Sequence, residues 1–158
     1  LADDEINSKV RFGICEDTCM VVKGYSVPSF RMKFLQMWNV TGKEPEDYGL
    51  DVRDPEFFYP PKLSMEGFVI PYGDSPLDQE TVGELVYLDI INTARNYVHI
   101  MTPYLILNYE LVQALQFAAK RGVETIIIMP HIPDKEYAFL LAKAHYEELI
   151  RAGVPIYE

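Results

Sequence analysis

Cysteine, positive charge and long apolar runs are all scarce in this sequence. Its two cysteines, Cys15 and Cys19, lack the companion Cys or His residues that a four-ligand structural zinc site needs. No run approaches the roughly 20 apolar residues that cross a bilayer, and the start of the chain lacks the basic head and apolar middle of a signal peptide. We therefore expect two ordinary thiols in or beside a strand, and a chain that is soluble as given.

Acidic residues outnumber basic ones. The 158 residues include 14 Lys and Arg against 24 Asp and Glu, for a formal net charge of -10 at pH 7. The summed field repels polyanions, which argues against a nucleic-acid groove or a broad footprint on an anionic membrane but leaves room for a local basic pocket. Hydrophobic residues make up 49% and charged residues 24%, an ordinary globular mixture for which one compact domain is the default expectation.

The first 41 residues predict a strand followed by an amphipathic helix. Residues 17–23 are rich in β-formers and are followed by Gly24. A helix then begins near Pro28. Its large apolar residues recur at helical spacing and are expected to face a core: Phe30, Phe34, Met37 and Trp38. Residues 42–66 lose this periodicity and gather four prolines among acidic residues, so we expect a linker there.

Residues 67–158 alternate strand and helix patterns. The expected elements are strands at 68–71, 97–102, 123–129 and 154–157 and helices at 80–96, 108–121 and 134–152, with Asn108 and Asp134 as N-caps and Gly122 and Gly153 as ends. The apolar run 123–129 is typical of a strand covered on both faces in a parallel sheet. The sequence therefore predicts an α/β fold, a mostly parallel sheet with helices on both faces.

Two loops at the carboxyl ends of the central strands are the candidate site. Ligands of open α/β sheets bind beyond these strand ends. The loops contribute Thr102 and Tyr104 after one strand and His131 and Asp134 after the next, and we expect the four side chains to converge on one sheet edge.

Each of these residues also has a purely structural interpretation. Pro103 can end a strand beside a packed tyrosine, and Asp134 can serve only as an N-cap. His131 is compatible with proton transfer or phosphate contact but shows no partner in the sequence. His145 lies on the apolar stripe of the last helix, where a hydrogen-bonded core histidine is expected.

Seven segments together resemble bacterial cardiolipin synthases of the phospholipase D superfamily, in the family's order and spacing. They are LADDEIN at 1–7, FLQMW at 34–38, GFVIPYGDSPLD at 67–78, TPYLIL at 102–107, AAKRGV at 118–123, PHIPD at 130–134 and AGVPIY at 152–157. The resemblance covers nearly the whole chain outside the linker. Two departures stand out: Cys15-Glu16 replaces a common Trp-Lys, and Ile126 replaces a common Arg, which removes one anion contact.

The resemblance implies that the chain is the region between the two His-x-Lys-x-x-x-x-Asp motifs of such an enzyme. Residues 1–41 would be the tail of the first phospholipase D-like half, 42–66 the linker, and 67–158 most of the part of the second half that precedes its motif. The fold would then be phospholipase D-like but incomplete. None of the three histidines begins a His-x-Lys pair, so no catalytic residue is expected within this chain.

The resemblance also implies a mechanism for the parent enzyme. One phosphatidylglycerol would transfer its phosphatidyl group through a phosphohistidine-type intermediate to a second, giving cardiolipin and glycerol, without a metal or another cofactor. The isolated chain would be inactive, and Thr102, Tyr104, His131 and Asp134 would line or brace the phosphate end of the substrate pocket. The parent would be attached to the cell membrane by sequence outside this chain.

Two other interpretations stay open. One is a phospholipase D-superfamily phosphodiesterase with a different substrate, although the net charge argues against nucleic acid. The other is a non-catalytic doubly wound binding module, which predicts a glycine-rich phosphate loop after a strand, whereas the junctions at 102–104 and 129–131 contain no glycine. For a fragment, strands at the cut edges would lose their neighbours, so self-association through exposed sheet edges is expected.

Overall fold

The computed structural model describes residues 7–10, 14, 19–24, 26–42, 67–75 and 79–158. The chain forms two compact units, one of residues 1–17 with 84–158 and one of residues 18–83. The length and composition of the chain led us to expect one compact domain, and the structure has two compact units instead. Residues 1–6, Cys15 and most of the expected linker, 43–66, lie outside the described residues. The division of the chain into 1–41, 42–66 and 67–158 stays a prediction.

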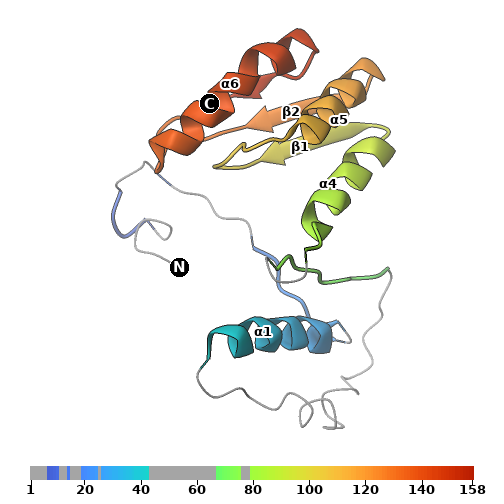
Figure 1. Ribbon diagram of the computed structural model, residues 1–158, viewed down its shortest axis with the longest axis vertical. Helices are drawn as coiled ribbons and strands as arrows, with labels where there is room; N and C mark the ends of the chain where they lie inside the picture. The colour runs from blue at the N-terminus through green and yellow to red at the C-terminus, as the bar shows by residue number, and fades with distance from the viewer. Residues whose placement is uncertain (1–6, 11–13, 15–18, 25, 43–66, 76–78) are drawn as a thin grey trace. The chain divides into compact units, whose positions relative to one another are not determined.

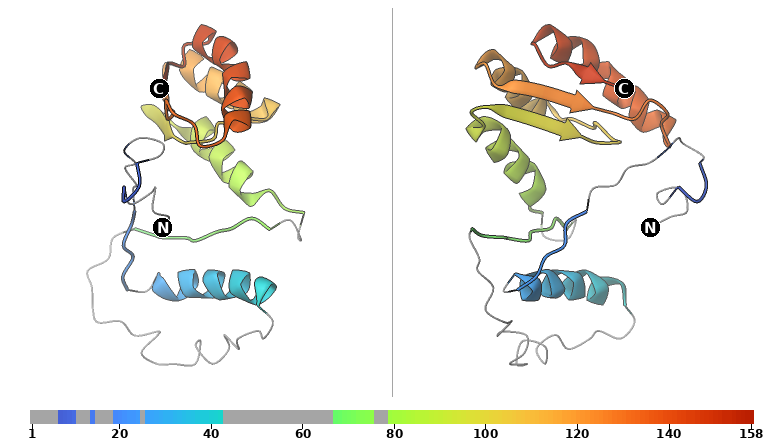
Figure 2. Two further views of the ribbon diagram at one scale, coloured as in Figure 1. Left: turned by 90° about the vertical axis from the view of Figure 1, so that its left-hand side faces the viewer. Right: turned by 180° about the vertical axis from the view of Figure 1, so that it is seen from behind.

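A three-stranded parallel sheet forms the centre of the unit that contains residues 84–158 (Figure 1). Its strands are β1 (Tyr97–Met101), β2 (Glu124–Ile128) and β3 (Ile156–Tyr157), in the order β1-β2-β3. The register pairs Val98 with Thr125 and Ile127 with Ile156. Figure 2 shows β1 and β2 side by side and pointing the same way. The predicted α/β class with a parallel sheet is confirmed.

Three helices alternate with these strands: α4 (Val82–Thr93), α5 (Tyr109–Lys120) and α6 (Glu136–Arg151). Asn108 is the N-cap of α5, as predicted, because its side-chain oxygen accepts a 3.0 Å hydrogen bond from the amide of Leu111. Gly122 and Gly153 follow α5 and α6 with φ of 86° and 96°, a left-handed conformation that glycine adopts without strain. Short-range signals therefore placed both of these helices correctly.

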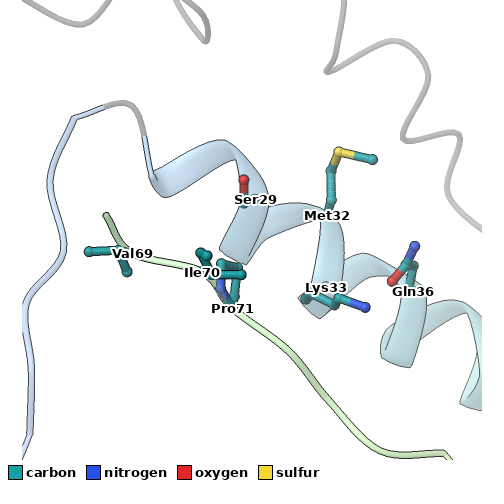
Figure 3. Close-up of a pocket in the computed structure, with 7 residues that line it drawn as sticks. All are labelled: Ser29, Met32, Lys33, Gln36, Val69, Ile70 and Pro71. Carbon is teal, nitrogen blue, oxygen red and sulfur yellow. The ribbon is translucent and has the colours of Figure 1, made fainter. Parts of the chain in front are cut away.

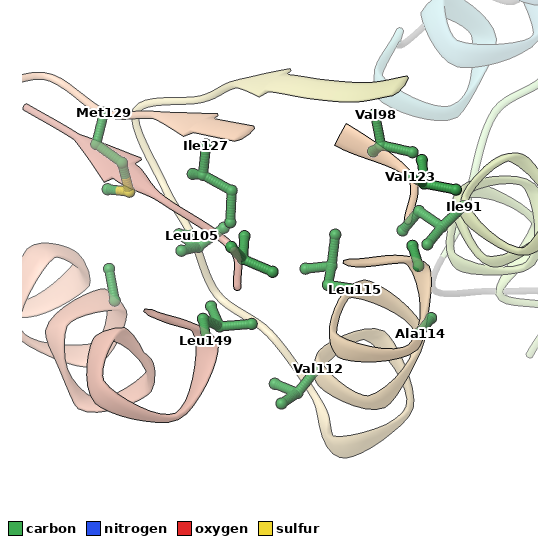
Figure 4. Close-up of a cluster of buried hydrophobic side chains, with 13 residues drawn as sticks. Ile91, Val98, Leu105, Val112, Ala114, Leu115, Val123, Ile127, Met129 and Leu149 are labelled. Atoms are coloured by element: carbon green, nitrogen blue, oxygen red, sulfur yellow. The ribbon is translucent and has the colours of Figure 1, made fainter. Parts of the chain in front are cut away.

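The core lies between the sheet and its helices (Figure 4). The alanine and leucine positions of α5 and α6 that face the sheet are buried: Ala114, Leu115, Ala118, Ala138, Ala142 and Leu149. Ile127 of β2 and Val154, which precedes β3, are fully buried against them. Arg121 joins α5 to α4, since its guanidinium donates hydrogen bonds of 2.8 and 2.9 Å to the carbonyls of Asn92 and Ile91 at the end of α4.

The two faces of the sheet differ in the described residues. Val98, Thr125 and Ile127 point to the core, whereas Tyr97 and Met101 of β1 are 63% and 72% exposed. The sequence predicted helices on both faces and a β2 strand covered on both. In the part of the chain that the structure describes, the buried residues of β2 are Thr125 and Ile127, which alternate with exposed or half-buried ones.

The unit of residues 18–83 is built around α1 (Val27–Thr41), which has a proline in its first turn as predicted. Among the residues of α1 whose burial the structure describes, Leu35 is the buried one. Phe34 and Trp38 stack with their ring centroids 5.8 Å apart and are 59% and 51% exposed, and Met37 is 72% exposed. The expectation that this stripe faces a core is therefore wrong in the described structure.

Residues 69–71 run along α1, where they border a cavity of about 330 Å³ with Ser29, Met32, Lys33 and Gln36 (Figure 3).

Two predicted strands are not strands in the described residues. Residues 19–23 and 68–71 have no ladder partner, and Phe68 is 97% exposed. Asp74, which follows residues 68–71 in the same segment, contacts the first turn of α4. Its two carboxylate oxygens accept hydrogen bonds of 2.9 and 3.0 Å from the amide of Gly83 in the first turn of α4. Across the described residues, no helix is long and apolar enough to cross a membrane.

Candidate functional site

Thr102 turns the chain at the carboxyl end of β1. Its amide continues the ladder by donating to the carbonyl of Ile128 at 3.1 Å. Its hydroxyl donates to the carbonyl of Tyr104 at 3.0 Å and accepts from the amide of Tyr104 at 3.2 Å. Such short side-chain to backbone bonds stabilise a tight turn. Thr102 therefore fixes the direction in which Tyr104 leaves the sheet.

The side chain of Tyr104 connects the two predicted loops. Its hydroxyl donates a hydrogen bond to Oδ2 of Asp134 in the loop after β2. The ammonium of Lys135 lies over the Tyr104 ring, 5.2 Å from its centroid. We call Thr102, Tyr104, Asp134 and Lys135 the Tyr104 cluster. The structure thus brings the side chains of Tyr104 and Asp134 together, and the Thr102 hydroxyl contacts the backbone of Tyr104.

The charges of this cluster are set by its contacts. The hydrogen bond to Asp134 raises the pKa of Tyr104, with a smaller contribution from burial, so the phenol keeps its proton at neutral pH. Interaction with Tyr104 in turn raises the pKa of Lys135, which therefore stays a cation. The cluster presents a fixed phenol, one carboxylate and one ammonium, and the ammonium is suited to attract a phosphate oxygen.

His131 lies in the same loop as Asp134 but contacts a different group. Its Nδ1 is 3.5 Å from Oε2 of Glu158, and its side chain is 80% exposed. Glu158 also accepts a 3.1 Å hydrogen bond from the hydroxyl of Tyr146 and lies 3.9 Å from the ammonium of Lys143. We call these four residues the Glu158 cluster. His131 therefore does not join Tyr104 in the described structure.

Tyr146 is the most strongly perturbed group of the Glu158 cluster. Burial, followed by the hydrogen bond to Glu158, raises the pKa of Tyr146 from 10.0 to about 12. Both causes favour the neutral phenol, because burial penalises the phenolate and the nearby carboxylate repels it. Tyr146 is therefore a proton-bearing donor that orients Glu158 over the whole physiological pH range.

Two structural interpretations need correction. Asp134 is not the N-cap of α6: the cap position is Lys135, with no side-chain cap bond, and Asp134 instead accepts the Tyr104 hydroxyl. His145 forms its expected hydrogen bond, at 2.7 Å to Oε1 of Glu148, but 29% of its side chain is exposed. His145 is therefore a surface residue that contacts Glu148 one turn later on α6, not a core histidine.

An apolar cavity of about 400 Å³ adjoins the Tyr104 cluster. It lies between α4, the end of β1, the segment 104–107 and α5, and Thr102 and Tyr104 belong to its wall. Sequence reasoning missed this cavity because its wall combines residues from four segments. It also missed Lys135, for which the only signal was its place next to Asp134. Among the described residues no group of three His, Cys, Asp or Glu side chains is arranged to hold a metal ion.

Comparisons with known proteins bear on the segment that contains both clusters. Residues 87–158 match the family model described as the phospholipase D-like domain of cardiolipin synthase. The chain is 28% identical to a cardiolipin synthase of Geobacillus thermodenitrificans and 32% identical to cardiolipin synthase 2 of Bacillus anthracis. The resemblance to cardiolipin synthases is confirmed. A further relative, 53% identical, is an uncharacterized protein of Streptococcus mutans.

These alignments cover the entire chain but only part of each relative. They span 31%, 30% and 33% of the Geobacillus, Bacillus and Streptococcus proteins, respectively. The chain thus spans about a third of the length of the curated relatives that it matches. No solved structure matches the chain. The cardiolipin synthase-like region includes α5, α6, all three strands and both clusters.

Proposed function

We propose that the full-length protein is a membrane-attached cardiolipin synthase and that this chain forms part of its substrate pocket. The observation that carries the proposal is the similarity to curated cardiolipin synthases along all 158 residues. The Tyr104 cluster adds support, because it sets a cation beside a fixed phenol at the sheet edge where ligands of α/β folds bind.

The proposed reaction has two displacements. A motif histidine attacks the phosphorus of one phosphatidylglycerol, the bond to the glycerol headgroup breaks, and the second motif histidine protonates the departing glycerol oxygen. A hydroxyl of a second phosphatidylglycerol then attacks the phosphohistidine, gives its proton to the second histidine and releases cardiolipin. Covalent catalysis divides one difficult transfer into two easier ones. Both histidines would come from outside this chain, so the chain alone is proposed to be inactive.

The residues of this chain would bind and position the lipid. The Lys135 ammonium attracts the phosphate charge, and the Asp134 carboxylate holds the Tyr104 hydroxyl. Thr102 fixes the turn that carries Tyr104. His131, exposed and 3.5 Å from Glu158, would meet the phosphate from the neighbouring loop. None of these roles requires the residue to form or break a covalent bond.

Product analysis on the full-length protein tests the proposal. Vesicles containing phosphatidylglycerol with radiolabelled phosphate should yield labelled cardiolipin, and free glycerol should appear at one mole per mole of cardiolipin. Phosphatidic acid without cardiolipin would replace the proposal with a phospholipase that uses water as the acceptor. No product from any phospholipid, with lipid binding retained, would favour a binding module.

A further inference from the structure

The cavity beside the Tyr104 cluster has an apolar floor and an apolar rim. Ile91, Leu105 and Leu115 are 3%, 2% and 0% exposed and form the floor. Tyr87 and Ile106 are 58% and 59% exposed at the rim. Large apolar side chains gathered around a hollow, rather than scattered, are typical of a binding surface. The volume of about 400 Å³ is within the range of roughly 300–1,000 Å³ found for small-molecule pockets.

Polar groups also border the cavity. His99, Thr102 and Tyr104 line its wall, and the Tyr104 hydroxyl and ring contact Asp134 and Lys135. A ligand that filled the cavity would therefore place an adjoining anionic group near the Lys135 ammonium. An apolar cavity with a cation nearby is complementary to an amphiphile that has an anionic headgroup.

We propose that this cavity holds the first part of an acyl chain of the phospholipid whose phosphate meets the Tyr104 cluster. The proposal rests on the proposed function and adds to it a specific place for the lipid tail. Burial of methylene groups is favourable without directional contacts, so the cavity needs no further polar group to retain the chain. Each methylene that enters is expected to strengthen binding about fourfold.

The competing occupant is another strand. β1 is an outer strand of the described sheet, and Ile100 and Met101 form part of the cavity wall. A strand from elsewhere in the protein, or from a second copy, could pair with this edge and close the cavity. Such pairing would protect the β1 amides from hydrogen exchange in the lipid-free protein, whereas an acyl chain would not hydrogen-bond to them.

Photo-crosslinking on the full-length protein distinguishes these occupants. The probe is phosphatidylglycerol with a diazirine in one acyl chain, presented in detergent micelles. We expect labelled peptides to contain residues 87–91, 99–107 or 111, and unlabelled phosphatidylglycerol to compete. Glycerophosphoglycerol, which has the headgroup and no acyl chain, should not compete for this label. Labelling confined to other peptides, or strong amide protection of β1 with an unlabelled cavity, would overturn the proposal.

Matched substitutions provide the control. Leu107→Trp fills the cavity from its wall and should lower labelling at least fivefold, while Leu140→Trp, at a 67% exposed position of α6, should leave it unchanged. Ile106→Glu places a charge at the exposed rim of the cavity and should also lower labelling. Because this position is exposed, the variant should keep its fold, which circular dichroism checks. Unchanged labelling in both cavity variants would contradict the proposal. A labelled cavity in a protein that makes no cardiolipin would overturn the proposed function alone.

Discussion

The hydroxyl of Tyr104 links two loops that are 30 residues apart in sequence. Tyr104→Phe keeps the ring below Lys135 but removes the hydrogen bond to Asp134. In the full-length protein we expect the KM for phosphatidylglycerol to rise roughly three- to tenfold and kcat to change less, because the role proposed for Tyr104 is to position the substrate without taking part in bond making. Tyr109→Phe, at an exposed tyrosine of α5, is the control. An unchanged KM would remove Tyr104 from the site.

Individual site residues could be predicted to the extent that their backbone position determined their contacts. The sequence placed Thr102, Tyr104 and Asp134 at one sheet edge because each follows a parallel strand, and in the structure Tyr104 contacts Asp134. His131 follows the same rule, yet its side chain contacts Glu158. Its rotamer, not its place in the sheet, decides the partner. Side-chain direction in a loop depends on neighbours distant in sequence, and the sequence carries little information about it.

Tyr146 makes a prediction about stability and pH. Its pKa is raised from 10.0 in the unfolded chain to about 12 in the folded one, so between these values the unfolded state releases its proton first. The stabilising contribution is therefore complete below pH 10 and decreases as the pH rises toward 12. We expect the difference in unfolding free energy between the native chain and Tyr146→Phe to change across this window and to be flat from pH 7 to 9. Denaturant titrations at each pH measure it, and a constant difference up to pH 12 would contradict the assignment.

At the scale of elements, the start of α4 depends on one close contact. A Cβ built on Gly83 would lie 2.4 Å from Oδ2 of Asp74, the carboxylate that binds the Gly83 amide. Gly83→Ala should therefore displace the Asp74 carboxylate and cost about 1–2 kcal/mol for the lost hydrogen bonds, offset in part by the roughly 0.5–1 kcal/mol by which a helix favours Ala over Gly. Gly73→Ala is the matched control, since a Cβ there meets nothing within 4 Å. Thermal unfolding of both variants tests this, and a Gly83→Ala variant more stable than the native chain would show that Asp74 moves aside at no cost.

The helices were more predictable than the strands because their signals are local. The cap at Asn108 and the glycines after α5 and α6 each act within a few residues. A strand needs a partner, and residues 68–71 have the composition of a strand without one in the described structure. The stripe of α1 shows the same difference: helical spacing predicted the helix, but the buried side chain is Leu35, and Phe34 and Trp38 are exposed in the described structure.

At the scale of the whole molecule, the sheet has an exposed outer edge and an exposed face. β1 and β3 are its outer strands among the described residues, and Tyr97 and Met101 project from the face of β1 that no described helix covers. The sequence predicted a parallel sheet from alternating patterns, but which face is covered depends on the entire tertiary structure. About two thirds of each curated relative lies outside the aligned region, so covering elements are not deducible from these 158 residues.

Unpaired strand edges and exposed apolar faces promote association, so the chain of 158 residues studied alone should self-associate as its concentration rises. Met101→Lys places a charge on the exposed face at the end of β1 and should weaken association at least tenfold. Leu140→Lys introduces the same charge on α6, at a similarly exposed position, and should have little effect. Sedimentation velocity over a hundredfold range of concentration measures both. A single monomeric species throughout would show that the edge of β1 is protected, and equal effects of the two lysines would assign the contact to general apolar surface instead of the sheet.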